Sequence, residues 1–120
     1  MPTTPRGVIT PTEAQELNDN WTDLRKGAND RAAGQSDNRS SWYSIQDLKD
    51  YIALVEDENP DATGIRFYLG VETTKEDPKG LTTIFIIPTE EIEGENKDIA
   101  TATGLDRGTN GVPPGAPYPQ

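Results

Sequence analysis

The stretch Leu81-Thr82-Thr83-Ile84-Phe85-Ile86-Ile87-Pro88 decides which folds this sequence can adopt. Successive side chains of a β-strand point to opposite faces of the sheet, so a half-buried strand alternates apolar and polar residues. The run from Ile84 to Ile87 does not alternate, which indicates a strand that is covered on both faces. Either other parts of the chain cover both faces, or one face meets a partner protein or a second copy of the chain.

A second strand is predicted just before this one, over residues 64–72. Its odd positions are apolar, and its even positions carry Arg66, Tyr68, Gly70 and Glu72. The polar loop 73–80 predicts that the strands 64–72 and 81–88 form an antiparallel hairpin. An isolated hairpin is marginally stable in water, so a third strand is needed from residues 40–43, from the C-terminal tail or from a second chain.

The first predicted helix begins after Thr10, a good N-cap that is followed by Pro11 and by Glu13 of a capping box. It ends at Gly34. Its apolar residues recur at spacings of three and four, which is the pattern of one helical face. These residues are Ala14, Leu17, Trp21, Leu24 and Ala28.

The second predicted helix begins after the N-cap Ser44 and ends near Glu58, because Asn59-Pro60 blocks its continuation. Its apolar face contains Ile45, Leu48, Tyr51, Ile52 and Val55.

These elements predict an α+β fold in which two amphipathic helices pack on a small antiparallel sheet. We expect one compact domain over residues 8–92 and an irregular tail rich in proline and glycine over residues 93–120. Three states are open for the proline-rich segment Pro113–Pro119: a ligand for a proline-reading groove, a strap folded over the domain, or disorder.

The charge and composition of the 120 residues exclude several function classes. The formal net charge is −10, which argues against binding to nucleic-acid phosphates or to an anionic membrane surface. The sequence shows neither a signal segment nor an apolar window long enough to span a bilayer, so we expect a cytoplasmic protein. A chain from which a leader had been removed would read the same.

The sequence contains no cysteine and no histidine. Disulfides, thiolate chemistry, the usual zinc ligand sets and the Ser-His-Asp triad are therefore excluded. Three acidic or loop segments resemble cation sites but lack the required ligand spacing or geometry. They are residues 57–61, 106–111 and 90–95. We expect no metal, no cofactor and no enzymatic activity.

The best candidate surface contains Arg66, Tyr68 and Glu72, which lie on one face of the predicted strand 64–72. The second part of this candidate set lies just before the second helix: Arg39, Trp42 and Tyr43. Arginine and aromatic residues are enriched at protein-binding hot spots. The competing interpretation is an ordinary solvated face in which Arg66 pairs with a nearby carboxylate.

Three segments together resemble an uncharacterised family of small proteins from Bacteroidota bacteria. They are residues 40–52 (Ser-Ser-Trp-Tyr-Ser-Ile-Gln-Asp-Leu-Lys-Asp-Tyr-Ile), 64–70 (Gly-Ile-Arg-Phe-Tyr-Leu-Gly) and 80–89 (Gly-Leu-Thr-Thr-Ile-Phe-Ile-Ile-Pro-Thr). The resemblance covers about residues 8–90 and implies a bacterial origin. It implies no activity, cofactor or partner, because none is known for that family.

Two functions from different classes are consistent with these observations. The first is a small non-enzymatic interaction module that forms a homodimer or binds a partner protein through the candidate surface. The alternative is a protein that binds a small anionic ligand in a pocket between the sheet and the helices, around Arg39, Tyr43 and Arg66. Two arginines would suit a carboxylate or a phosphate.

Overall fold

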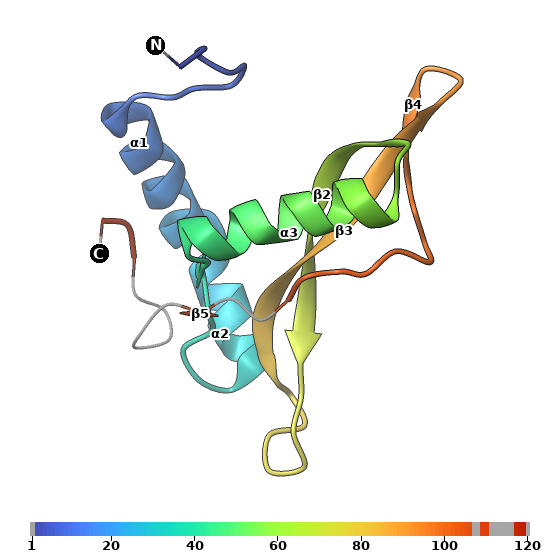
Figure 1. The fold of residues 1–120 in the computed structure, drawn as a ribbon. Coiled ribbons are helices and arrows are strands. Elements are labelled where there is room, and N and C mark those ends of the chain that lie inside the picture. The colour runs from blue at the N-terminus through green and yellow to red at the C-terminus, as the bar shows by residue number, and fades with distance from the viewer. Residues whose placement is uncertain (1, 107–108, 111–116, 120) are drawn as a thin grey trace.

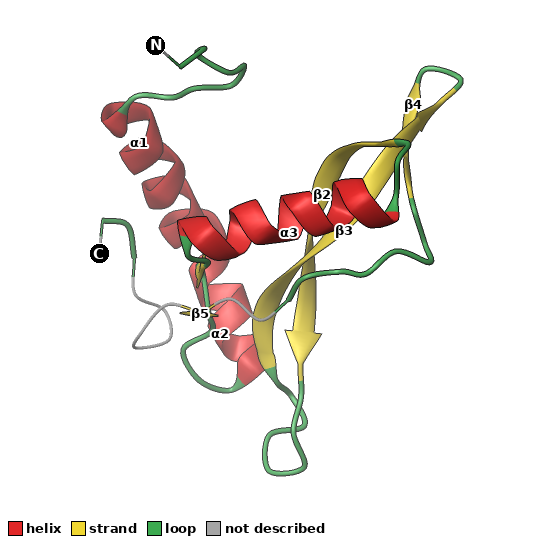
Figure 2. Cartoon of the chain, in the orientation of Figure 1, coloured by secondary structure: helices red, strands yellow, loops and turns green. Residues whose placement is uncertain are grey.

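The structure is a computed structural model that describes residues 2–106, 109–110 and 117–119. Figure 1 shows a long helical rod beside a twisted antiparallel sheet, with one further helix crossing that sheet. The elements, coloured by type in Figure 2, are α1 (Pro11–Trp21), η1 (Thr22–Lys26), α2 (Gly27–Ala33), β1 (Ser41–Trp42), α3 (Ile45–Glu58), β2 (Ala62–Glu72), β3 (Leu81–Ile92), β4 (Glu95–Asp98) and β5 (Thr109–Asn110).

The first three elements form the continuous helix that the sequence predicts. At its start the Glu13 backbone N–H donates to Thr10 Oγ1 at 3.1 Å, and the Thr10 N–H donates to Glu13 Oε1 at 3.2 Å. This capping box satisfies donors that the helix itself leaves free. At its end Gly34 has φ +73°, a left-handed conformation that glycine adopts without strain. The π-helical turn η1 in the middle has no signal in the sequence.

The helix α3 packs on the sheet and supplies most of the core. The Asp47 backbone N–H donates to Ser44 Oγ at 2.9 Å, which confirms the predicted cap. Tyr51 and Val55 are buried against Ile86 of β3. Five partly buried side chains surround this cluster: Tyr43, Leu48, Ala62, Ile65 and Leu105.

The sheet has the strand order β2-β3-β4, and both pairings are antiparallel. Phe67 lies opposite Ile86 and Tyr68 lies opposite Phe85, which confirms the predicted hairpin. The fold is therefore α+β, as the sequence predicts. The third strand is β4, which comes from the C-terminal tail, one of the three sources that the sequence left open, although we expected that tail to be irregular. The suggested contribution of residues 40–43 to this sheet was wrong, because β1 pairs with β5 in a separate two-stranded sheet.

The strand β3 continues four residues beyond the predicted end at Pro88, to Ile92. Proline has no backbone N–H, and it is tolerated here because its nitrogen points away from β2. The pairing of β3 with β2 therefore loses no hydrogen bond. The neighbouring backbone shows this direction: the Pro88 carbonyl accepts from the Ile99 N–H at 2.9 Å, on the side opposite β2. The pairing of β3 with β4 starts only at Thr89, opposite Asp98.

Before β4 begins, side chains from a loop complete the second edge of β3. The Thr82 N–H donates to Asp37 Oδ1 at 2.7 Å, and the Thr82 hydroxyl donates to Asp37 Oδ2 at 2.5 Å. The Asn38 side-chain amide donates to the Thr82 carbonyl at 3.0 Å. Asp37 and Asn38 are both buried. Two loop side chains therefore take the place of a neighbouring strand.

Further along the same edge, β3 makes hydrogen bonds with one residue that precedes it in the sequence and with one that follows it. The Tyr43 hydroxyl donates to the Ile84 carbonyl at 3.0 Å. Leu105 and Ile86 exchange two backbone hydrogen bonds, of 2.7 and 3.0 Å. Part of the segment that follows β4 thus lies against β3 as an additional bridge. The proline-rich residues 113–116, on which one of our tail predictions rests, lie outside the described residues.

The apolar face of the first helix is largely exposed, with Leu17 61% and Leu24 68% accessible. It contacts the rest of the chain mainly through the loop that precedes β1. In the part of the chain that the structure describes, no helix has the length and apolarity needed to cross a bilayer.

We predict that Asp37→Ala lowers the free energy of unfolding by roughly 2–4 kcal/mol, because it leaves buried backbone donors without an acceptor. Asp57→Ala, which removes an exposed carboxylate of α3, is the matched control and should change stability little. Urea denaturation followed by circular dichroism measures both. Equal effects of the two substitutions would contradict the role assigned to Asp37.

A second prediction concerns Tyr51, whose hydroxyl donates to the Thr103 carbonyl at 2.9 Å and to the Ile86 carbonyl at 3.4 Å. Tyr51→Phe should cost about 1 kcal/mol at neutral pH. Burial, and then the Glu58 charge, raise the pKa of Tyr51 above 10.0. The folded state therefore holds this proton more tightly than the unfolded state, and its contribution disappears as the pH rises from about 10 through the folded pKa.

The measurement for this second prediction is the difference in unfolding free energy between the wild type and Tyr51→Phe as a function of pH. The difference should be constant near neutral pH and shrink above pH ~10. A difference that grows with alkaline pH would contradict the assigned pKa direction.

Candidate functional site

The candidate residues on β2 form a small polar cluster with β4. Arg66 Nη1 lies 2.6 Å from Asp98 Oδ1, and Arg66 Nη2 donates to the Asn96 carbonyl at 3.0 Å. The Tyr68 hydroxyl donates to Asp98 Oδ2. The Tyr68 hydroxyl first, and the Asp98 carboxylate second, raise the pKa of Arg66 above its ordinary value. Arg66 is therefore a firmly protonated member of a surface ion pair.

The Tyr68 ring also stacks on Phe85 of β3, with the ring centroids 5.2 Å apart and the planes at 15°. Cross-strand aromatic pairs of this kind stabilise a sheet face. Asp98 was not among our predicted site residues. In the sequence, Asp98 is marked only by its place in an acidic segment that has no helical or strand periodicity. It can be recognised as the partner of Arg66 only when β4 is known to pair with β3.

Arg39 lies in a different environment from Arg66. Its guanidinium carbon is 4.4 Å from the centroid of the Trp21 ring, a cation–π contact. Its Nη2 donates to Asn18 Oδ1 and to Thr22 Oγ1, both at 2.9 Å. Arg39 thus attaches the loop before β1 to the first helix. Its described partners, Asn18, Thr22 and Trp21, differ from those of Arg66, which are Asp98 and Asn96.

The other candidate residues are also separated. The Tyr43 hydroxyl is occupied by the Ile84 carbonyl. Trp42 is 63% exposed on β1, and Glu72 is exposed at the end of β2. The six predicted residues therefore form no single convergent site: Arg66 and Tyr68 meet, Glu72 shares their strand, and the others serve the loop between the first helix and α3.

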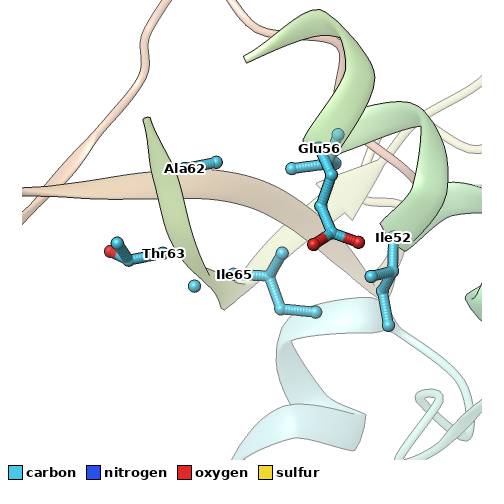
Figure 3. A pocket seen from close by; sticks show the side chains of 7 residues that line it. Ile52, Glu56, Ala62, Thr63 and Ile65 are labelled. Carbon is cyan, nitrogen blue, oxygen red and sulfur yellow. The ribbon is translucent and has the colours of Figure 1, made fainter. Parts of the chain in front are cut away.

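A cavity of about 210 Å³ lies between α3 and the beginning of β2. Figure 3 shows the Glu56 carboxylate directed toward the space between Ile52 and Ile65. The lining residues are Ile52, Val55, Glu56, Ala62, Thr63, Gly64 and Ile65. The charged group at this cavity is a carboxylate, and none of Arg39, Tyr43 and Arg66 lines it. It therefore lacks the basic groups that an anionic ligand requires.

A shallower hollow of about 440 Å³ lies along α1, where Arg39, Trp21 and Tyr118 are among its lining residues. The Tyr118 backbone N–H donates to Asn18 Oδ1 at 3.0 Å, so a residue near the C-terminus rests on α1. Arg39 points its guanidinium at Asn18, Thr22 and Trp21 in this hollow. Within the described ranges, no three His, Cys, Asp or Glu side chains are grouped so as to hold a metal ion.

The most unusual surface belongs to the odd-numbered residues of β2. Phe67 is 57% exposed, Leu69 77% and Val71 62%. Alternation of apolar and polar residues, as in this strand, is typical of a strand whose apolar face is buried. The helix α3 packs near Ile65. The first helix and the loop after it border Leu69 and Val71 across small hollows but leave both side chains largely exposed. A surface that the pattern identifies as core is thus left open.

The outer edge of β2 is open as well. Phe67 and Ile86 are direct partners, and Ile86 turns its N–H and carbonyl away from β2 toward Leu105. In an antiparallel pair this makes Phe67 turn its own N–H and carbonyl away from β3. The same holds for Ile65, Leu69 and Val71. No other described segment hydrogen-bonds to this edge, which is the end of the strand order.

The three strands of the sheet differ in how their edges are protected. The edge of β3 is completed by Asp37, Asn38, Tyr43 and Leu105. The strand β4 has four residues and presents charged side chains, which discourage pairing with another strand. The strand β2 has 11 residues, and its protection is a bulge between Ala62 and Gly64 at one end. We call the backbone edge and exposed side chains of residues 65–71 the β2 surface.

Comparison of the chain with protein-family models, with curated proteins and with solved structures gives no match. The resemblance to a Bacteroidota family therefore stays a prediction.

We predict that Asp98→Ala lowers stability by less than about 1 kcal/mol, because an exposed ion pair contributes little in water. The hydrogen bond from Tyr68 to Asp98 can be checked directly by NMR spectroscopy. The Tyr68 side-chain resonances should shift in Asp98→Ala and stay in place in Asp61→Ala, which removes an exposed carboxylate outside the cluster. Unchanged Tyr68 resonances in both variants would contradict the cluster.

Proposed function

We propose that this protein is a small, non-enzymatic interaction module of bacterial origin, which self-associates or binds a partner protein through the β2 surface. The single observation that carries the proposal is the long unpaired edge of β2 with its exposed apolar side chains. Unprotected edges of this length are templates for another strand, and native proteins normally block them. The same chain blocks its two other edges.

The mode of binding that fits this surface is strand addition. An incoming extended segment would hydrogen-bond to the outward backbone groups of Ile65, Phe67, Leu69 and Val71. Alternate side chains of that segment would cover the exposed apolar residues. Burial of this apolar surface supplies the driving force, and the backbone hydrogen bonds fix the direction and register.

Arg66, Tyr68 and Glu72 have a secondary role in this proposal. They lie on the opposite face of the same strand and would contact the even-numbered side chains of the added segment. Arg66 and Tyr68 are already oriented by Asp98, so their ordering costs little on binding. The lack of histidine and cysteine in the sequence supports the non-enzymatic assignment.

The test uses a synthetic peptide with the sequence of residues 62–72 and the isotope-labelled full chain. The peptide should shift and protect the amide resonances of the outward-facing residues of β2. A control peptide that carries lysine in place of Phe67 and Leu69 should bind at least ~10-fold more weakly, because it cannot cover the apolar side chains. If neither peptide perturbs β2, the edge does not accept strands and the proposal fails.

A further inference from the structure

We propose that the segment added to β2 is the β2 strand of a second copy, so that two chains form one continuous six-stranded antiparallel sheet around a two-fold axis. This inference rests on the proposed function and names the partner. Three properties of β2 support this pairing: the direction of its free backbone groups, the distribution of its apolar side chains, and its local charge.

The backbone restricts how two β2 strands can pair. The free N–H and carbonyl groups belong to odd-numbered residues, so odd residues must face odd residues across the new interface. A shift of one residue would place outward groups opposite inward ones. It would also bring the apolar face of one copy beside the polar face of the other. The remaining registers are those in which odd residues face odd residues, and each of them is shifted from the next by two residues.

Among these registers, one pairs all the apolar residues. With Tyr68 on the two-fold axis, Phe67 lies opposite the partner's Leu69, and Ile65 lies opposite the partner's Val71. With Phe67 on the axis, Val71 would face Thr63 in the bulged part of the strand. With Leu69 on the axis, Ile65 would face Thr73, beyond the end of the strand at Glu72. Residues 65–71, the β2 surface, are thus complementary to themselves in the register that pairs this surface along its whole length.

The charges agree with this pairing. The chain carries a net charge of −10, so two copies repel each other over most of their surfaces. Residues 64–71 contain no acidic side chain and one arginine, Arg66. In the proposed register Arg66 lies opposite the partner's Gly70 and is the diagonal neighbour of the partner's Glu72. Diagonal side chains on an antiparallel pair are within reach of a long arginine.

The register places Tyr68 in a distinctive position. Its N–H and carbonyl point toward β3, so the two copies of Tyr68 form a non-hydrogen-bonded pair across the axis, with Cα atoms about 4.5 Å apart. That separation lies within the range that a disulfide spans. The chain has no native cysteine, so a single introduced cysteine reports on the register without interference.

The first experiment is sedimentation of the full chain over a range of concentrations. We expect a monomer–dimer equilibrium that tightens as salt is added, because salt screens the repulsion between the acidic copies. Leu69→Lys should raise the dissociation constant by roughly 100-fold or more, since it would bury an ammonium group beside the partner's Phe67. Leu24→Lys is the matched control, an equally apolar and exposed position on η1, and should leave the dimer intact.

The second experiment is amide hydrogen exchange on the unmodified chain, which needs no substitution that could disturb folding. Dimer formation should slow the exchange of the Ile65, Phe67, Leu69 and Val71 amides as the concentration rises. A dimer in which these amides exchange at the monomer rate would overturn β2 pairing.

The third experiment tests the register by oxidation of single-cysteine variants. Tyr68→Cys should form a disulfide-linked dimer, and Glu72→Cys, on the same strand and face but opposite Gly64, should not. Circular dichroism checks that each variant is folded. Cross-linking of Phe67→Cys or Leu69→Cys in preference to Tyr68→Cys would overturn the register.

These results separate the two proposals. A chain that stays monomeric up to ~1 mM while the peptide of residues 62–72 still binds β2 would overturn the second copy as partner and leave the interaction module standing. A chain that stays monomeric and also fails to bind the peptide would overturn both the second copy as partner and the interaction module.

Discussion

The structure depends on how the second edge of β3 is completed. This strand is the centre of the sheet and contributes Ile86 to the core, yet β4 accompanies it only over its last residues. Asp37 takes the place of a strand at Thr82, and it also accepts from the Asn38 N–H at 2.9 Å. The Asp37 N–H in turn donates to Asp30 Oδ1 at 2.9 Å, and this bond, ahead of the ion pair with Lys26, lowers the pKa of Asp30. The Asp37 carboxylate also accepts from the Asn29 side-chain amide at 3.2 Å, so this one buried residue connects the helical rod to the sheet.

This arrangement explains how a chain with 32% hydrophobic residues holds its first helix, its sheet and α3 together. The apolar cluster of Tyr51, Val55 and Ile86 is small. Directional hydrogen bonds from the loop 37–43 and from the segment that follows β4 supplement it, and each satisfies a backbone group that would otherwise be costly to bury. The apolar residues of β2 and of the first helix add little to this core, because they lie on the surface. Surface of this kind is available for contacts with other molecules.

The sequence predicted the elements whose signals are local. The caps at Thr10 and Ser44, the helix stop at Gly34 and the alternation of residues 64–72 each depend on neighbouring residues, and all appear in the structure. A third strand from the tail was one of three alternatives, but the position of β4 and the continuation of β3 past Pro88 were not predicted, because both depend on pairing between distant segments. The candidate site was predicted only in part for the same reason. Arg66 and Tyr68 were identified by residue type, but Asp98 is visible only through the register of β4, and the exposure of Phe67 and Leu69 contradicts the pattern that suggested burial.

The groups that complete the edge of β3 come partly from before it and partly from after it in the sequence. This affects the folding of the chain while it is being synthesised. When the hairpin of β2 and β3 leaves the exit tunnel, Asp37 and Tyr43 are already outside it, but Ile99 and Leu105 are still inside it. The middle of the β3 edge therefore stays open until Ile99 and Leu105 have also left the tunnel. During that interval both edges of the nascent hairpin are open, whereas in the described part of the folded chain the β3 edge is closed. Late closure of this kind makes the growing chain prone to intermolecular pairing before residues 99–105 reach β3.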